Sequence, residues 1–328
     1  DWSLHKSDPA SVPMFKDLIH KSLNCKNSSF ELPLDSVIKA LNSQKNPTTT
    51  HIIPPTGFVF HESRCGSTLV ANTLSAASPS RHRVYSESAP LIEALRACGD
   101  GGTRWRDGAC HRAAHLSLVK DVVTIMGLTN DVEESRLFFK VQSIGTKSIA
   151  VMRAAFPRVP WVFVYRDPVQ VMMSHLKTKE QRSAVCLRYR SRPQEDLKML
   201  VKEAGRDVAS LSTEEHCAAH LASLCQAALT NHKSSTTGIM LNYVDIPQKL
   251  LSTVFPDHFH IPIGKDATER VNAVCGKYSK GRGVKGEWVH DSDAKENRAW
   301  DEVRAASELF LKDVTDSLMG DTGGAVKR

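Results

Sequence analysis

Residues 64–68, Arg-Cys-Gly-Ser-Thr, combine the chemical groups that bind a phosphate or sulfate group. They follow the apolar run Gly57–Phe60 and precede the helical pattern Leu69–Leu74. A glycine lets the backbone approach an anion, and the N-terminus of the following helix carries partial positive charge. A capped helix start without a ligand is the alternative. The residues that we expect to form an anion-binding loop are Arg64, Cys65, Gly66, Ser67 and Thr68.

The loop differs from that of nucleoside triphosphatases. Their pattern, Gly-x-x-x-x-Gly-Lys-Ser/Thr, requires glycine and lysine where this chain has His61 and Ser67. The lysine that binds β and γ phosphates is therefore missing. This favours a ligand with a single 5′-phosphate group, with Arg64 as the local cation. A nucleotide-dependent small-molecule kinase and a non-catalytic nucleotide-binding protein remain the alternative functions.

A second anion site is predicted at residues 161–174. Trp161–Tyr165 is a continuous apolar run, typical of a strand buried on both faces. Pro168 suits the first turn of the helix that follows. Arg166 at the strand end and Ser174 about two helical turns later can both point at one anion beyond the carboxyl edge of a parallel sheet. An ion pair between Arg166 and Asp167 is the alternative.

Together, these two motifs resemble those of the sulfotransferase family, whose donor is 3′-phosphoadenosine 5′-phosphosulfate. In that family the first loop binds the 5′-phosphosulfate, and an Arg-Asp-Pro with a serine eight residues after the arginine binds the 3′-phosphate. The resemblance covers residues 57–176. It implies donor contacts from Arg64 to Thr68 and from Arg166 and Ser174, and it says little about the acceptor.

The motifs look most similar to those of protein-tyrosine sulfotransferases, in which a glutamate about 20 residues after the loop serves as the base. Glu87 matches that glutamate, and Lys140 matches a lysine at the end of a later strand. The resemblance implies that Glu87 takes the acceptor proton. Arg64 and Lys140 would stabilise charge on the sulfuryl and bridging oxygens. His61 is the rival base, because many relatives that act on small molecules use histidine.

The basic, glycine-rich stretch 276–286 resembles a late family loop that folds over the donor, although an exposed flexible loop is the alternative. The donor contacts that this resemblance adds are Tyr243, Ser279, Lys280, Gly281 and Arg282. The acceptor is expected to be a hydroxyl of a peptide tyrosine, a glycan or a small metabolite. We expect the secretory pathway, in the Golgi lumen, rather than the cytoplasm.

Composition agrees with an anionic ligand. The 328 residues carry a formal charge of +7 and have a pI near 9.0, which favours a nucleotide or an acidic acceptor. The lysines and arginines are dispersed without a nucleic-acid motif, so we expect no nucleic-acid partner. No run approaches the 18 apolar residues of a membrane span. No feature of the sequence predicts an oligomeric state. Because the chain opens with Asp1, we expect that an upstream segment was removed.

The eight cysteines show no metal-ligand spacing, so no metal site is expected. Cys98 and Cys110 flank a glycine-rich loop and could close a disulfide. Cys217 and Cys225 lie about 12 Å apart along a predicted helix, beyond disulfide reach, so buried free thiols are expected there. His216 and His220 share that helix and, without a third ligand, are expected to be surface or packing residues.

Strand and helix patterns alternate through the middle of the chain. This alternation predicts an α/β fold with a P-loop-like parallel sheet and helices on both faces. Residues 1–55 are expected to form an N-terminal arm packed on a single domain of residues 56–328. The predicted strands are 57–61, 83–86, 136–141, 161–165 and 238–244. The predicted helical segments are 34–41, 68–77, 89–97, 113–128, 146–156, one from 168, and a charged region 178–232.

Overall fold

The computed structural model describes residues 2–27, 31–43, 50–98, 111–179, 184–281 and 291–321. Its centre is a five-stranded sheet in the order β3-β5-β2-β6-β7, with every neighbouring pair parallel. The strands are β2 (Pro55–His61), β3 (His82–Ser86), β5 (Arg136–Lys140), β6 (Trp161–Tyr165) and β7 (Gly238–Asn242). Two further strands, β1 (His51–Ile52) and β4 (Leu128–Thr129), form a small antiparallel pair.

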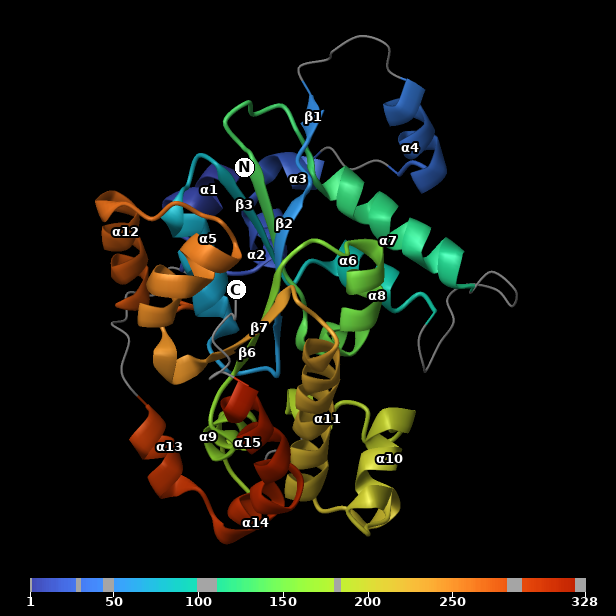
Figure 1. The fold of residues 1–328 in the computed structure, drawn as a ribbon, viewed down its shortest axis with the longest axis vertical. Coiled ribbons are helices and arrows are strands. Elements are labelled where there is room, and N and C mark those ends of the chain that lie inside the picture. The colour runs from blue at the N-terminus through green and yellow to red at the C-terminus, as the bar shows by residue number, and fades with distance from the viewer. Residues whose placement is uncertain are drawn as a thin grey trace.

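Helices cover both faces of the sheet, as the alternation predicts. Figure 1 shows α5 and α12 beside one face and α6, α7 and α8 beside the other, whereas α9, α11, α13, α14 and α15 gather at one end. The N-terminal half contains α1 (Trp2–Ser7), α2 (Phe15–Lys21), α3 (Leu23–Asn27), α4 (Leu34–Ser43), α5 (Ser67–Ala77), α6 (Ala89–Leu95), α7 (Arg112–Met126), η1 (Ser143–Ser148) and α8 (Ile149–Ala155). The C-terminal half contains α9 (Pro168–Leu176), η2 (Val185–Leu187), α10 (Glu195–Glu203), η3 (Val208–Ser210), α11 (Thr213–Lys233), η4 (Tyr243–Asp245), η5 (Leu250–His258), α12 (Lys265–Cys275), α13 (Ser292–Arg298), α14 (Asp301–Phe310) and α15 (Lys312–Asp321).

The strand order has one point at which successive connections change from one side of β2 to the other. From β2 the chain moves outward to β3 and back to β5, then crosses to the other side of β2 to form β6 and β7. Loops on the two sides of such a reversal diverge and leave a crevice at the carboxyl edge of the strands. In this fold the crevice lies between the ends of β2 and β6, where both predicted anion-binding motifs begin.

The central strands are fully covered, which explains their continuous apolar sequences. All five residues of β6 are buried, and Trp161 and Phe163 are each no more than 1% exposed. The ring of Phe60 on β2 packs edge-on against Trp161 at 6.0 Å between centroids. Burial of aromatic side chains of this size is a dominant favourable term in folding. The strand ends at the carboxyl edge are therefore held on a rigid support.

The N-terminal segment packs on the sheet through aromatic side chains. The rings of Trp2 and Phe15 lie 4.9 Å and 5.0 Å from the ring of Tyr85 on β3. Ser86 donates a hydrogen bond to Met14 Sδ at 3.4 Å. These contacts bring α1 and α2 to the end of β3, near Glu87. The division into an arm of residues 1–55 and a domain of residues 56–328 stays a prediction.

The predicted strands and the helices from 34 to 176 are present, with ends shifted by a few residues. The region 178–232 is helical in part, because its described residues contain α10, most of α11 and the short segments η2 and η3. Four helices after residue 264, α12 to α15, were not predicted. Their apolar positions are spaced among many charged residues, so they form a stable face only when packed against the rest of the chain.

One cysteine prediction is also wrong. Cys217 is not a free thiol, because it forms a disulfide with Cys186, whereas Cys225 is buried and free as expected. The helix spacing correctly separates Cys217 from Cys225, but it gives no information on a partner in a different segment. Cys98 is disulfide-bonded, and Cys110 lies outside the described residues.

Of the helices in the described part of the chain, none combines the length and the apolarity that a membrane crossing requires.

Candidate functional site

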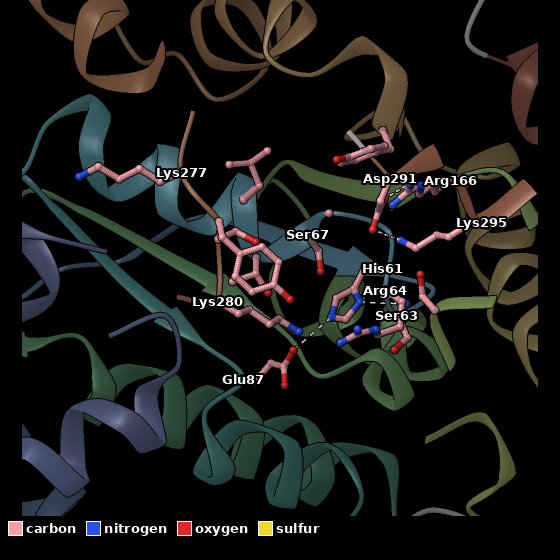
Figure 2. A pocket seen from close by; sticks show the side chains of 17 residues that line it. His61, Ser63, Arg64, Ser67, Glu87, Arg166, Lys277, Lys280, Asp291 and Lys295 are labelled. Carbon is pink, nitrogen blue, oxygen red and sulfur yellow. Dashed lines mark hydrogen bonds and ion pairs between the residues drawn. The ribbon is translucent and has the colours of Figure 1, made fainter. Parts of the chain in front are cut away.

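A cleft of about 840 Å³ opens at the carboxyl edge of the sheet. Figure 2 shows Lys280, His61 and Glu87 at one side of the cleft and Arg166, Asp291 and Lys295 at the other, with Ser67 between them. The residues that line the cleft are His61, Ser63, Arg64, Gly66, Ser67, Thr68, Leu69, Glu87, Arg166, Ser174, Tyr243, Lys277, Tyr278, Ser279, Lys280, Asp291 and Lys295.

The loop after β2 has the conformation of an anion cradle. Gly66 has a φ of 86°, in the left-handed region that glycine adopts without strain. A Cβ atom at this position would collide with the ring of Tyr243. Helix α5 starts at Ser67, so its first backbone N–H groups lack acceptors within the helix. Because Ser67 and Thr68 line the cleft, this helix terminus presents donors and partial positive charge to it.

Cys65 belongs to the loop but does not line the cleft. Its thiol is fully buried and donates a hydrogen bond to the Val164 carbonyl at 3.0 Å. Burial raises the pKa of this thiol to about 12, so it stays protonated. Cys65 therefore fastens the loop to strand β6, and of this residue only the backbone is left to contact a ligand.

The second predicted motif reaches the same cleft from β6 and α9. The guanidinium of Arg166 is 5% exposed and lies 4.4 Å from the ring centroid of Tyr243, in a cation–π contact. Ser174 donates to the Gln170 carbonyl at 2.8 Å, and both Arg166 and Ser174 line the cleft. Asp167 does not pair with Arg166 but caps α9 by accepting from the Gln170 N–H at 3.0 Å. The alternative of an Arg166–Asp167 pair is thus excluded.

A carboxylate of the chain itself pairs with Arg166. Arg166 Nη2 lies 3.0 Å from Asp291 Oδ1 and 2.9 Å from Ser292 Oγ. Lys295 Nζ lies 2.6 Å from the other oxygen of Asp291. Burial would raise the pKa of Asp291, but Lys295 and Arg166 lower it, so the group is a carboxylate at neutral pH. The geometry of Arg166 and Lys295 therefore accommodates an anion at this end of the cleft.

Glu87 and Lys140 form an ion pair at the opposite end. Glu87 follows β3 and Lys140 ends β5, and Lys140 Nζ donates to Glu87 Oε1. The Glu87 backbone N–H also donates to the Lys140 carbonyl at 2.7 Å, and Glu87 has a φ of 56°. Burial would raise the pKa of Glu87, but Lys140, His61 and Lys280 lower it to about 2. Glu87 is therefore ionised at neutral pH, with its side chain 29% exposed at the cleft.

The ring of His61 is held in one tautomer by the loop. Its Nδ1 accepts a hydrogen bond from the Ser63 N–H at 3.0 Å, which leaves the ring proton on Nε2. Nε2 lies 3.8 Å from Glu87 Oε1. Burial and the nearby charge of Lys140 lower the pKa of His61 well below its usual value. In this geometry the neutral ring has no lone pair facing the cleft.

A buried carboxyl connects the two anion motifs. Glu62, which follows β2, accepts the Arg166 N–H at 2.6 Å and the Cys225 thiol at 3.4 Å. Its burial raises its pKa to about 8, so it is mostly protonated at neutral pH. Glu62 fixes the backbone of Arg166 relative to the loop that starts at Arg64, two residues later. No motif in the sequence indicates this role.

The late loop supplies part of the cleft. Ser279 and Lys280 line it, and the Ser279 carbonyl accepts from Asn72 Nδ2 on α5 at 3.0 Å. Burial, with the nearby charge of Lys140, lowers the pKa of Lys280 to about 8. Gly281 lies next to this wall without lining it, and Arg282 lies outside the described residues.

The structure thus brings together most of the side chains that the sequence singled out. Cys65 and Lys140 do not line the cleft, because the thiol of Cys65 and the ammonium of Lys140 are buried. The site residues that sequence reasoning missed are Ser63, Leu69, Lys277, Tyr278, Asp291 and Lys295. Lys277 and Tyr278 lie within the stretch 276–286 but were not singled out there, whereas Asp291 and Lys295 belong to the N-cap and body of the short charged helix α13, which carries no motif. Within the described ranges, no group of three or more His, Cys, Asp or Glu side chains could hold a metal ion.

Comparisons with known proteins find distant structural similarity. No family model and no curated protein matches the sequence. The structure is similar to that of sulfotransferase STF9 from Mycobacterium avium, with 11% identity, a TM-score of 0.48, and coverage of 86% of this chain and 81% of that one. It is also similar to the sulfotransferase domain from the curacin biosynthetic pathway, at 14% identity, a TM-score of 0.44, and 79% and 98% coverage. A third similar structure is the sulfotransferase domain of the Synechococcus PCC 7002 olefin synthase, at 11% identity, a TM-score of 0.43, and 84% and 97% coverage. These likenesses are too distant to assign a family, so the side chains of the cleft must carry the functional conclusion.

Proposed function

We propose that the protein is a sulfotransferase that moves a sulfuryl group from 3′-phosphoadenosine 5′-phosphosulfate to a hydroxyl acceptor. One observation carries this proposal. The anion cradle at Ser67 and the anion site at Arg166 open into a single cleft, and the ion pair of Glu87 and Lys140 lies at the cradle end. A ligand with two separated anionic groups matches the two sites, and the carboxylate and ammonium suit transfer chemistry at one of them.

The donor contacts follow from the positions of the charges. The α5 N-terminus with Arg64 would hold the 5′-phosphosulfate. Arg166 and Ser174 would hold the 3′-phosphate, where Asp291 now provides a carboxylate at 3.0 Å. The ring of Tyr243, which lies between Gly66 and Arg166, offers an apolar surface to the nucleoside. The missing loop lysine at Ser67 disfavours a nucleoside triphosphate in the same cleft.

The reaction needs one proton acceptor and several cations. The acceptor oxygen forms a bond to sulfur while the bond from sulfur to the bridging oxygen of the 5′-phosphate breaks. Glu87 receives the acceptor proton, since its carboxylate is ionised at neutral pH. Lys140, Lys280 and Arg64 stabilise the negative charge that moves onto the departing adenosine 3′,5′-bisphosphate. His61 orients the loop, because its Nδ1 is already engaged by Ser63.

The first test is ligand binding followed by transfer. Adenosine 3′,5′-bisphosphate should raise the melting temperature of the protein, whereas ATP with magnesium should not. Transfer of labelled sulfate from the donor should then be measured with a phenol, an alcohol and a tyrosine peptide as acceptors. Stabilisation by ATP with magnesium, without stabilisation by the bisphosphate, would contradict the proposed function.

A further inference from the structure

A second cavity of about 1110 Å³ adjoins the donor cleft on the side of Glu87. The two cavities share His61, Ser63, Arg64, Glu87 and Lys280. A group bound in the second cavity therefore meets Glu87 and Arg64 next to the donor cleft. If the proposed function holds, this is where an acceptor hydroxyl can approach Glu87 without displacing the nucleotide.

The walls of this cavity come from several separate elements. Met14 and Lys16 come from the N-terminal segment, Arg96 from the end of α6, and Ile144 from η1. His220 on α11 and the segment around η2 also line it. The remaining lining residues are Gln142, Ser143, Val185, Arg188 and Tyr189. Walls on so many sides suit a compact molecule better than an extended polymer.

Two of these walls are joined directly. The guanidinium of Arg96 lies 5.9 Å from the ring centroid of Tyr189, in a cation–π contact between the end of α6 and the segment after η2. That segment is held to α11 by the Cys186–Cys217 disulfide. Arg190 holds it further by donating to the Leu211 carbonyl at 2.7 Å. Arg188 and Tyr189 therefore stand on an anchored support.

The charge of the lining is strongly unbalanced. Among the described residues that line the cavity, the cations are Lys16, Arg64, Arg96, Arg188 and Lys280, and the carboxylate is Glu87. Glu87 is already paired with Lys140. Arg96 and Arg188 lie in the part that does not border the donor cleft, so the donor phosphates do not neutralise them. Uncompensated cations of this kind attract an anionic ligand and select against a neutral one.

We propose that the second cavity is the acceptor site and that it selects a small hydroxy acid, with Arg96 and Arg188 binding its carboxylate while its hydroxyl faces Glu87. The proposal rests on the proposed function for the identity of the reaction. The charge preference of the cavity can be measured independently of it. No sequence motif marks these two arginines, because they come together only through α6 and the disulfide-linked segment.

The test compares acids with their uncharged amides. Binding of 4-hydroxyphenylacetate and 4-hydroxyphenylacetamide, and of 3-hydroxybutyrate and its amide, is measured by calorimetry with protein saturated with adenosine 3′,5′-bisphosphate. The acid of at least one pair should bind about tenfold more tightly than its amide, and the phenolic and aliphatic pairs show which hydroxyl fits. R96Q and R188Q should each reduce this preference about threefold, as expected for exposed charge pairs, and the double variant should nearly abolish it.

R158Q is the matched control. Arg158 is exposed, lines neither cavity, and its substitution changes net charge equally. It should keep the acid preference. Thermal stabilisation by adenosine 3′,5′-bisphosphate should be unchanged in R96Q and R188Q, which verifies that these variants fold.

Three results would overturn the proposal. The first is equal or absent binding of acid and amide in both pairs. The second is an acid preference that survives in the double variant. The third is tight binding of an acidic tyrosine peptide while neither small acid binds. If adenosine 3′,5′-bisphosphate fails to stabilise the protein, the proposed function fails. The charge preference of the cavity is then tested by the same comparison of acids and amides with protein that carries no bisphosphate.

Discussion

Arg166 and Asp291 are 125 positions apart in the chain, yet Arg166 Nη2 and Asp291 Oδ1 lie 3.0 Å apart at the end of the donor cleft. The Asp291 carboxylate stands where the 3′-phosphate of the proposed donor would bind. It bridges Arg166 to Lys295, at 2.6 Å from the lysine ammonium. A donor phosphate has to replace this carboxylate, and it can then use both cations. The α13 segment is therefore expected to respond to the donor.

Asp291→Asn should strengthen binding of adenosine 3′,5′-bisphosphate by about two- to fivefold, because a neutral amide competes less well for Arg166. Adenosine 5′-phosphosulfate, which lacks the 3′-phosphate, should bind as before. Calorimetry with both ligands checks this. Asp293→Asn, at an exposed position on the same helix, is the control. Weaker bisphosphate binding in Asp291→Asn alone would show that Asp291 positions the site rather than blocks it.

Arg166→Ala should weaken binding of adenosine 3′,5′-bisphosphate by about 1.5 to 3 kcal/mol, through loss of a charge-assisted contact. The guanidinium is buried and fixed by Gln170 Oε1 at 2.8 Å, so its direction is preset. Binding of adenosine 5′-phosphosulfate should hardly change. An equal loss for both ligands would mean that Arg166 is structural.

Glu87→Gln should lower turnover by about 10² or more, since the amide cannot accept the acceptor proton. Donor affinity should survive, because the carboxylate contributes no attraction to an anionic donor. His61→Ala should have the smaller effect on turnover, as His61 Nδ1 is engaged with the Ser63 N–H. Steady-state turnover of both variants tests this. Near-normal turnover in Glu87→Gln, with none in His61→Ala and intact donor binding, would assign the base to His61.

Glu62→Gln should change how stability depends on pH. In the folded protein burial raises the pKa of Glu62 to about 8, whereas the unfolded chain releases this proton near pH 4.5. The folded state thus binds more protons between these values, and Glu62 makes the free energy of unfolding fall as pH rises through this window. Relative to the wild type, Glu62→Gln should gain stability as pH rises from 5 to 8.5, by at most about 4 kcal/mol.

Denaturant unfolding of both proteins at pH 5 and pH 8.5 measures this difference. At pH 5 Glu62 keeps its proton in the folded protein and is only just above its pKa in the unfolded chain, so ionisation should contribute little to the difference between the two proteins. Glu203→Gln, an exposed carboxylate at the end of α10, controls for the loss of one acidic group. The same offset between Glu62→Gln and wild type at both pH values would show that Glu62 is ionised in the fold.

Local signals were enough for the sheet and for the anion cradle. The run Trp161–Tyr165 is apolar at every position because both faces of β6 are covered, and that pattern is visible without a structure. Gly66 and Ser67 are likewise adjacent in sequence and act through the backbone of one loop. The parallel strands then bring Arg64, Glu87, Lys140 and Arg166 to one edge.

Contacts between distant segments could not be predicted in this way. Cys217 was expected to be a free thiol because its own helix offers no partner, but Cys186 reaches it from another segment. The α12 to α15 helices were missed for a related reason, since their amphipathic faces are stable only against the rest of the fold.

The sequence by itself determined where the five strands lie and which loops follow β2 and β6, because these depend on neighbouring residues and on the direction of parallel strands, whereas the choice of Glu87 as candidate base rested on a resemblance of motifs. The tertiary structure alone decided which groups neutralise one another. It pairs Glu87 with Lys140 and Arg166 with Asp291, and among the described residues it gives Arg96 and Arg188, which line the second cavity, no carboxylate partner. Charge compensation depends on distances of a few ångströms between residues far apart in the chain, and these distances are set by how the helices pack on the sheet.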